Sequence, residues 1–513
     1  MSAPGPARAA PAGKALALRP APIGAAFVLG ALAVGSFAPF SVFPLAPVTL
    51  AVLLVMCERY PRTAPAAAYA YGLGLFLCGV SWVYVSLHDF GAMPAPLAAL
   101  ATFIFCAFLA LFPALAVYAL IRVRFAPAFA LVVFFPAAWT LLEWTRGWIF
   151  TGFPWLAYGY SQIAASPLAG YAPLLGIYGV SLTVSMTAGL CALIWQRYRS
   201  GERWKHWPVL LVALWLGGWA LKQVTWTHPE GEPVTISLLQ GNVPQDLKFR
   251  PERIEKTLAD YRALALSSTS RLIIFPETAL PIFLDNVPQA YLAALAAHAR
   301  QNGGDMLIGV PLRLPDGRYF NSVITVGTSA PQRYHKFHLV PFGEFIPLRP
   351  LLGPVVGALA IPLQDFSRGT AHPQPLEVAG QRVAVNICYE DAFGEEIIRQ
   401  LPQATLLANV SNVAWFGHSI APSQHLQISQ ARALETGRYL VRATNTGVTA
   451  VIDPRGAVIA RAEQYTRIVV NHRVPGYAGA TPYVRWGNLP LIAICVALLA
   501  VALLCGRHRS TAP

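Results

Sequence analysis

The sequence predicts a multi-pass α-helical membrane domain joined to an α/β domain. Hydrophobic residues make up 55% of the 513 residues and charged residues only 12%, whereas soluble domains carry about a quarter charged residues. The charged residues are also unevenly spread, because long apolar stretches precede and follow a polar segment at about 224–486. This composition excludes a purely soluble enzyme.

Charge-free apolar stretches predict where the chain crosses the membrane. A spanning helix needs about 20 apolar residues, and the stretch between Arg19 and Glu58 is long enough for two helices. The eight predicted spans are 22–39, 46–57, 66–87, 95–121, 127–144, 170–195, 207–223 and 487–506. The predicted organisation is a flexible basic tail (1–21), a membrane domain with seven spans (22–223), an α/β domain (224–486), a C-terminal transmembrane helix (487–506) and a cytoplasmic tail (507–513).

The basic residues predict the orientation of these spans. The formal net charge is +14, and the basic residues lie beside apolar runs, which favours a membrane over nucleic acid as the partner. Short cytoplasmic loops collect Lys and Arg. Alternate connections do so here, at Arg59/Arg62, Arg122/Arg124, 197–205 and Arg507/Arg509. The α/β domain is therefore expected on the non-cytoplasmic face.

Short β-branched runs and helical patterns alternate in part within the polar segment. Helical patterns occur at Pro251–Ser268, Val287–Asn302 and Ser423–Thr436. The runs are 234–240, 271–277, 305–311, 321–327, 382–388, 405–411, 440–445 and 448–453. This mixture predicts an α/β domain with a largely buried sheet.

Two of the predicted strands lead directly into reactive side chains, Glu277 and Cys388. Functional groups of α/β sheets collect at the carboxyl ends of strands. Glu277 is therefore a candidate base, although an acidic residue can simply end a strand. Cys388 is the only one of seven cysteines in the polar segment; it is a candidate nucleophile, or else a small buried apolar residue. No cysteine or histidine cluster has metal-ligand spacing, so we expect no metal.

Lys336 lies between these strands, in an irregular segment at 334–347 that prolines interrupt. Such a loop can present a functional ammonium, or it can be a solvated basic turn. In the membrane part, Glu143 is unusual because acidic residues at membrane depth are rare. We expect it to pair with Arg146, three residues further along the same helix face.

These residues occur in an order that resembles a known family. The motifs are Phe275-Pro276-Glu277, Lys336 to Glu344, Cys388-Tyr389-Glu390 and Asn412-Val413-Ala414-Trp415. They resemble the Glu–Lys–Cys set of the nitrilase (carbon–nitrogen hydrolase) superfamily. The segments Arg146–Trp155 and Gln240–Gln245 and the eight-span topology resemble its membrane-embedded apolipoprotein N-acyltransferase family. The resemblance implies an αββα sandwich for the α/β domain.

The resemblance also implies roles for individual residues. Cys388 would attack a phospholipid ester with Glu277 as base, while Lys336 and the backbone N–H of Tyr389 stabilise the oxyanion. The thioester would then pass its acyl chain to the N-terminal amine of a diacylglyceryl-cysteine apolipoprotein, in a ping-pong mechanism. The residues expected to line or support the site are Glu344, Tyr389, Glu390, Trp415 and Phe249. The chain departs from the family at Val413, where Asp is usual, and at Phe249, where Trp is common.

Two other functions remain open on the residues alone. A membrane-tethered amidase would use the same Glu277, Lys336 and Cys388, with water resolving the thioester, although seven spans ahead of the domain exceed what an anchor requires. A transporter or receptor would be expected to carry charged or broken helices in its membrane part. For the acyltransferase we expect no cofactor, membrane lipids as partners, a monomer, and a bacterial inner-membrane location with a periplasmic catalytic domain.

Overall fold

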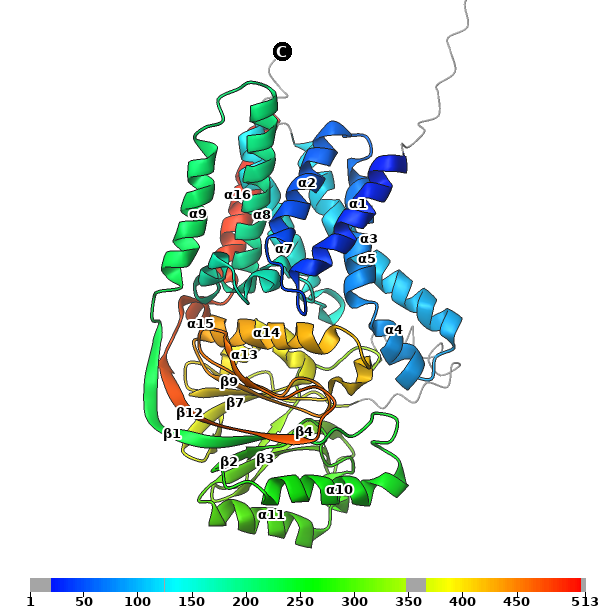
Figure 1. Ribbon diagram of the computed structural model, residues 1–513, viewed down its shortest axis with the longest axis vertical. Helices are drawn as coiled ribbons and strands as arrows, with labels where there is room; N and C mark the ends of the chain where they lie inside the picture. The colour runs from blue at the N-terminus through cyan, green and yellow to red at the C-terminus, as the bar shows by residue number, and fades with distance from the viewer. Residues whose placement is uncertain (1–19, 124, 347–365, 509–513) are drawn as a thin grey trace, which may run out of the picture.

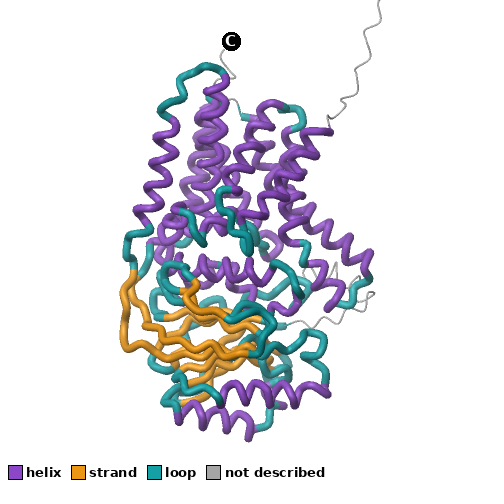
Figure 2. The backbone as a smooth tube through the Cα atoms, in the orientation of Figure 1, coloured by secondary structure: helices purple, strands orange, loops and turns teal. Residues whose placement is uncertain are grey.

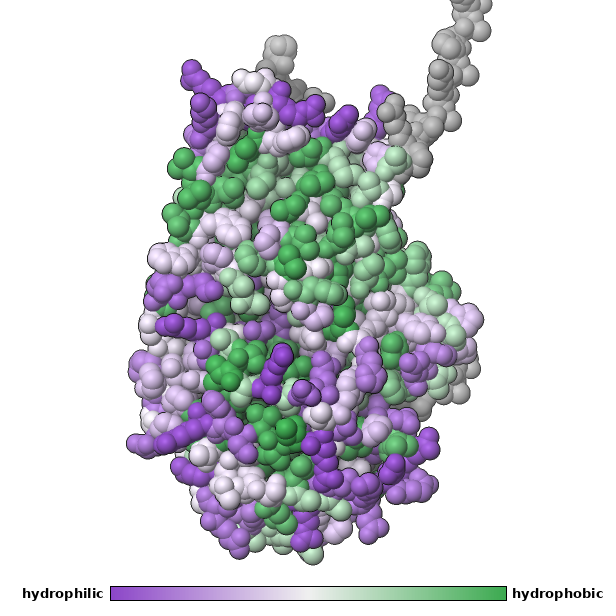
Figure 3. Space-filling view, viewed as in Figure 1, coloured by the Kyte–Doolittle hydropathy of each residue, from purple (hydrophilic) through white to green (hydrophobic). Residues whose placement is uncertain are grey.

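A computed structural model describes residues 20–123, 125–346 and 366–508 of the chain. Most of its helices gather at one end of the molecule, its strands lie at the other end with further helices beyond them, and helix α14 (Ala421–Thr436) lies between the strands and the large group of helices (Figures 1 and 2). Apolar side chains form a broad band on the visible face of the helical end, and polar ones lie above and below that band (Figure 3). The band is therefore suited to an apolar surrounding, and the surfaces above and below it are suited to water.

The helical end is built from elements that are apolar on all sides. Its helices are α1 (Pro20–Ala33), α2 (Leu45–Arg59), α3 (Ala64–Val80), α4 (Val83–Val85), α5 (Ala95–Arg122), α6 (Pro127–Phe129), α7 (Phe135–Arg146), α8 (Ala172–Arg199), α9 (Trp207–Leu221) and α16 (Leu489–His508). Helices without a polar face suit a lipid environment. Exposed Leu100, Ile104, Leu216 and Trp219 show that apolar side chains also cover their outer surface.

Three helices of the described chain are long and apolar enough to cross a membrane, namely Ala95–Arg122, Pro127–Arg146 and Pro167–Arg199. The pair Ala64–Val80 and Val83–Phe90 adds a fourth if it is one span bent by 54°. Ala21–Ser36, Trp207–Leu221 and Leu489–Ala502 are apolar but shorter. A 15-residue helix such as α9 is only about 22 Å long, against a hydrocarbon core of about 30 Å. The count of eight spans therefore stays a prediction.

The other end is a sandwich of two six-stranded sheets, ordered β12-β1-β2-β3-β4-β5 and β11-β10-β9-β8-β7-β6. The first sheet contains β1 (Thr227–Gln240), β2 (Leu272–Ile274), β3 (Asp305–Arg313), β4 (Tyr319–Gly327), β5 (Arg333–His335) and β12 (Ile468–Gly479). The second contains β6 (Leu376–Val378), β7 (Gln381–Ile387), β8 (Leu406–Ser411), β9 (Leu440–Thr444), β10 (Ala450–Ile452) and β11 (Val458–Arg461). Each sheet has a parallel centre, β1–β2–β3 or β7–β8–β9, and antiparallel edges.

Alternation along the strands builds the core between the sheets. Val234, Ile236 and Leu238 of β1 share one apolar cluster with Val383 and Val385 of β7. Because side chains two residues apart share a face of a strand, the intervening residues point to the outer faces, where helices cover them. Helices α10 (Pro251–Leu266) and α11 (Gln289–Gln301) lie beyond the first sheet, and α14 lies beyond the second (Figure 1). This is the expected αββα arrangement, with one helical layer against the membrane helices.

Candidate active site

Three loops that follow strand ends bring the predicted reactive groups together. Glu277 follows β2, Lys336 follows β5 and Cys388 follows β7. Because β2 and β7 belong to different sheets, the site lies where the two sheets meet. The Lys336 ammonium is 3.5 Å from the Glu277 carboxylate, and Cys388 interacts electrostatically with both groups.

Cys388 sits at a sharp turn from β7 into a short helical segment. Its φ of +54° lies in the left-handed region, which costs a non-glycine residue about 1–3 kcal/mol. Two buried side chains hold the peptide in this conformation, since its carbonyl accepts from Asn409 Nδ2 at 3.3 Å and from His425 Nε2 at 3.2 Å. The surrounding structure therefore fixes the direction of the thiol.

The Cys388 thiol is protonated in the resting site. Burial, and to a lesser extent the Glu277 carboxylate, raise its pKa to about 12, whereas Lys336 and the backbone N–H of Asn412 act in the opposite direction. Only the thiolate is an effective nucleophile. A base must therefore take the proton as the sulfur reacts.

The Glu277 carboxylate is 7% exposed and is oriented by donors on both oxygens. Oε1 accepts from Asn321 Nδ2 at 2.7 Å, and Oε2 accepts from the backbone N–H of Asn412 at 2.8 Å. Hydrogen bonds of this kind favour the ionised, acceptor form of a carboxylate. Glu277 is therefore arranged to accept a proton.

Lys336 is buried, with 1% of its side chain exposed, between two carboxylates. Its Nζ lies 2.9 Å from Glu344 and 3.5 Å from Glu277. Burial alone would lower its pKa, but the charges of Glu344 and Glu277 outweigh that effect and raise it. Lys336 is thus a permanent cation, and Glu344, which was expected to line or support the site, forms the closer of its two ion pairs.

Asn321 is a member of the site that the sequence did not reveal. Its Nδ2 donates to Glu277 at 2.7 Å and to Glu344 at 3.0 Å. Its backbone carbonyl also accepts from the N–H of Lys336 at 2.9 Å. One asparagine in β4 therefore links the candidate base, the second carboxylate and the lysine loop. A lone asparagine inside a predicted strand carries no signal for such a role.

Glu390 supports the loops rather than reaching the reacting groups. Its Oε1 accepts from the backbone N–H groups of Phe337 and His338 at 2.7 and 3.0 Å. Its Oε2 accepts from the N–H of Ile387 at 2.7 Å and from Tyr334 Oη at 2.8 Å. Burial raises the pKa of Glu390 to about 7, although these donors oppose the shift. Glu390 thus joins the Lys336 loop to the Cys388 loop.

Tyr389 connects the site to the membrane part. Its hydroxyl donates to the carbonyl of Gly152 at 2.8 Å, and its ring stacks on Trp155 with centroids 6.5 Å apart. Gly152 has a φ of +89°, and a Cβ there would lie 2.1 Å from the carbonyl oxygen of Gly147. Only glycine fits this turn.

The remaining predicted positions lie at the edge of the site. Trp415 is 37% exposed and contacts Phe90 edge-on, with centroids 6.1 Å apart. Phe249 is 54% exposed, and the Lys248 ammonium lies 5.9 Å from the centre of its ring. Val413 is buried, and its side chain lies against Gly447.

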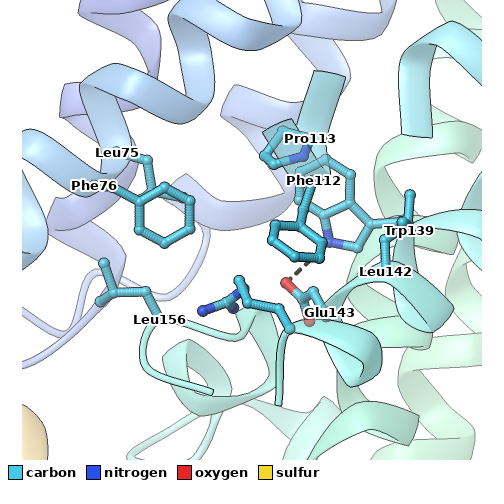
Figure 4. Close-up of a pocket in the computed structure, with 9 residues that line it drawn as sticks. Leu75, Phe76, Phe112, Pro113, Trp139, Leu142, Glu143 and Leu156 are labelled. Carbon is cyan, nitrogen blue, oxygen red and sulfur yellow. Dashed lines mark hydrogen bonds between the residues drawn. The ribbon is translucent and has the colours of Figure 1, made fainter. Parts of the chain in front are cut away.

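The predicted pairing of Glu143 with Arg146 holds only as an electrostatic attraction between the two charges, without direct contact. Glu143 Oε1 accepts from Trp139 Nε1 at 3.0 Å (Figure 4). It also accepts from the backbone N–H of Tyr158 at 3.0 Å. Arg146 donates to the carbonyls of Phe153 and Trp155, each at 2.6 Å, and in the described residues no ion pair within 4.0 Å joins the two side chains. The loop offers backbone groups at both positions, so each charge binds the loop instead.

Glu143 and Arg146 also line a small cavity between α3, α5 and α7 (Figure 4). Apolar side chains form the rest of its lining, among them Leu75, Phe76 and Leu156. Arg146 holds the loop through its hydrogen bonds to the carbonyls of Phe153 and Trp155. The same loop contains the Gly152 carbonyl that accepts from the Tyr389 hydroxyl. In the described part of the chain, no group of three His, Cys, Asp or Glu residues is placed to hold a metal ion.

Comparison with known proteins covers both parts of the chain. Residues 29–190 match the apolipoprotein N-acyltransferase N-terminal domain, and residues 235–483 match the carbon-nitrogen hydrolase family. An apolipoprotein N-acyltransferase of Nitrosomonas europaea is 53% identical over 95% of this chain and 98% of its own length. One of Chromobacterium violaceum is 47% identical over 94% of each chain. Among solved structures, an amidase from Nesterenkonia sp. covers 51% of this chain and 96% of its own, at 18% identity and a TM-score of 0.38.

Proposed function

Because the chain belongs to the apolipoprotein N-acyltransferase family, a family of membrane enzymes, we propose that Cys388 carries an acyl group between two lipids. The donor is a phospholipid, and the acceptor is the N-terminal amine of a diacylglyceryl-cysteine apolipoprotein. The reaction proceeds through a thioester in two steps, so its kinetics are ping-pong.

In the first step, the Cys388 sulfur attacks the ester carbonyl of the phospholipid while Glu277 takes the thiol proton. The Lys336 ammonium and the backbone N–H of Tyr389 are the donors proposed for the oxyanion. Removal of one such donor typically costs about 10²–10³ in rate. Collapse of the intermediate breaks the ester C–O bond, and Glu277 returns its proton to the leaving oxygen. The products are the acyl-enzyme and a lysophospholipid.

In the second step, the amine of the apolipoprotein attacks the thioester carbonyl. Glu277 takes a proton from the attacking nitrogen, and the C–S bond breaks as the amide forms. The proton returns to the sulfur, which restores the resting thiol. The raised pKa of Cys388 favours this return.

The observation that carries the proposal is the contact between the reactive loops and the membrane helices. Tyr389, next to the nucleophile, hydrogen-bonds the Gly152 loop. Phe416 packs on Trp82 with centroids 4.5 Å apart, and Trp415 packs on Phe90. A thiol beside membrane helices can receive an acyl chain that stays in the bilayer. An amidase acting on soluble amides would gain nothing from this placement.

We also propose a bacterial inner-membrane location with eight crossings and the sandwich on the periplasmic side. The basic connections support this orientation, since α8 and α16 run away from the sandwich and end at the opposite pole of the molecule (Figure 1). Arg197 and Arg199 end α8, as expected of a cytoplasmic loop. We also propose that the protein acts as a monomer.

The proposal is tested by following the acyl group. Purified protein is incubated with labelled phospholipid, and mass spectrometry is used to look for an acyl adduct on Cys388. A diacylglyceryl-cysteine peptide should then discharge the adduct and carry the label as an amide. Discharge by water alone would instead indicate the hydrolase, and active protein without an adduct would exclude covalent catalysis.

Two cysteine variants provide matched controls. Cys388→Ala should abolish acylation, because no other described cysteine belongs to the site. Cys106→Ala should acylate at nearly the normal rate, since Cys106 lies buried in α5. Equal activity in the two variants would refute the assignment of the nucleophile.

A further inference from the structure

Lys248 is a buried cation beside the site to which the proposed mechanism gives no role. Lys248 lies in the loop between β1 and α10. The loop is at the surface, since Phe249, the residue after Lys248, is 54% exposed. Lys248 itself is only 2% exposed. A lysine side chain normally keeps its charge in water, so an ammonium turned inward from a surface loop requires a partner.

The partner is the main chain of the candidate base. Lys248 Nζ donates to the backbone carbonyl of Glu277 at 3.1 Å. The same loop reaches the Glu277 carboxylate by a second route, because Gln245 Oε1 accepts from Asn412 Nδ2 at 2.8 Å and the Asn412 N–H donates to Glu277 Oε2 at 2.8 Å. The loop therefore contacts the Glu277 carbonyl directly and reaches its carboxylate only through Asn412.

The charge of Lys248 also interacts with the charges of the candidate site. Burial lowers the pKa of Lys248 to about 8, while the Glu277 carboxylate and Cys388 oppose this shift. Lys336 lies on the other side of the carboxylate, 3.5 Å from Oε1. On the loop itself, Arg250 is exposed and bonds the backbone of Asp246. The charged groups that face Lys248 are therefore those of the reaction site.

We propose that Lys248 is a positioning residue for Glu277: its ammonium holds the Glu277 peptide and favours the ionised carboxylate that accepts the thiol proton. The inference rests on the proposed function, because it assigns a role within the same acylation step. Lys248 acts through Glu277 and does not touch the reacting atoms. Its loss should therefore lower the rate of acylation more than the apparent affinity for the phospholipid.

The test compares Lys248→Met, which keeps the length without the charge, with Lys248→Arg, which keeps a charge. In single-turnover acylation by labelled phospholipid, Lys248→Met should be slower by about 10², the scale of a misplaced catalytic group. The effect should lie in kcat rather than KM, and Lys248→Arg should recover part of the rate. Lys256→Met is the control, because Lys256 lies nearby on α10 with 60% of its side chain exposed.

The pH profile separates positioning from a merely structural role. In the unmodified protein, the rate should fall above about pH 8 as Lys248 loses its proton, and this alkaline limb should disappear in Lys248→Arg. Measurement in the absence of acceptor keeps the titration of the incoming amine out of the profile.

Alkylation of Cys388 by iodoacetamide, followed by mass spectrometry, measures the thiol without any lipid. If Lys248→Met folds and both reactions keep their normal rate and pH profile, the inference is overturned while the proposed function stands. If the unmodified protein forms no acyl-enzyme although Cys388 alkylates, the proposed function fails and the inference falls with it. A loss confined to KM would also overturn the positioning role.

Discussion

Replacing Glu277 with Gln tests the need for a base at the thiol. With a pKa of about 12, only about 10⁻⁵ of the Cys388 side chains are thiolate at pH 7, which corresponds to about 7 kcal/mol at 1.36 kcal/mol per pH unit. A general base typically contributes about 10²–10⁴ in rate. Glu277→Gln should therefore slow acylation by about this factor at neutral pH.

Glu277→Gln should also change the Cys388 thiol, in the direction that favours reaction. Because the Glu277 carboxylate raises the pKa of Cys388, its removal should lower that pKa and increase the thiolate fraction at every pH. The acylation rate of Glu277→Gln should consequently rise about tenfold per pH unit below the thiol pKa, as measured by single-turnover acyl-enzyme formation. Glu255→Gln, at an exposed position of α10, serves as the control. A variant that acylates at the normal rate, or slowly but independently of pH, would refute the reasoning.

Two further substitutions test contacts that the sequence did not reveal. Asn321→Leu removes the donor shared by Glu277 and Glu344. A lost hydrogen bond to a charged group costs about 1.5–3 kcal/mol, so single-turnover acylation should slow by about 10- to 10²-fold, and a normal rate would contradict the assigned contact. Gln424→Leu leaves the indole N–H of Trp155 without its acceptor at a cost of about 1–3 kcal/mol, so thermal unfolding in detergent should begin at lower temperature; an equal midpoint would show that this contact adds no stability.

The sequence predicted the elements whose pattern is local. The apolar runs before Glu277 and Cys388 are strands β2 and β7, because buried parallel strands are continuous hydrophobic runs. Strand β12 was not predicted, since its sequence contains Pro475 and Gly476 among polar residues. Its pairing with β1 over nearly the whole strand is what makes it a strand, and strand preference depends on such neighbours.

In the candidate site, too, the residues marked by a local pattern were predicted, and those that depend on distant partners were not. The motifs bearing the nucleophile, the base and the lysine stand at strand ends and are visible in the sequence. Asn321 and Lys248 both contact Glu277 from far away along the chain. Asn321 is 44 residues from Glu277 in the sequence, and Lys248 is 29 residues from it. No periodicity or spacing encodes such contacts. Glu143 and Arg146 attract each other without a direct ion pair for the same reason, because helix spacing does not reveal a loop that folds back onto both side chains.

Helix α14 makes the two halves of the molecule inseparable. Gln424 accepts from Trp82 and Trp155 of the membrane part at 3.1 and 2.8 Å, while the adjacent His425 holds the carbonyl of Cys388. Further along the helix, Glu435 accepts from the backbone N–H of Ile177 at 2.6 Å. Cutting the chain to liberate a water-soluble fragment would strip these side chains of their partners and loosen the turn on which the sulfur stands. The membrane helices therefore help to hold Cys388 in its reactive position. The reactivity of Cys388 should be measured only on the intact chain in detergent or lipid.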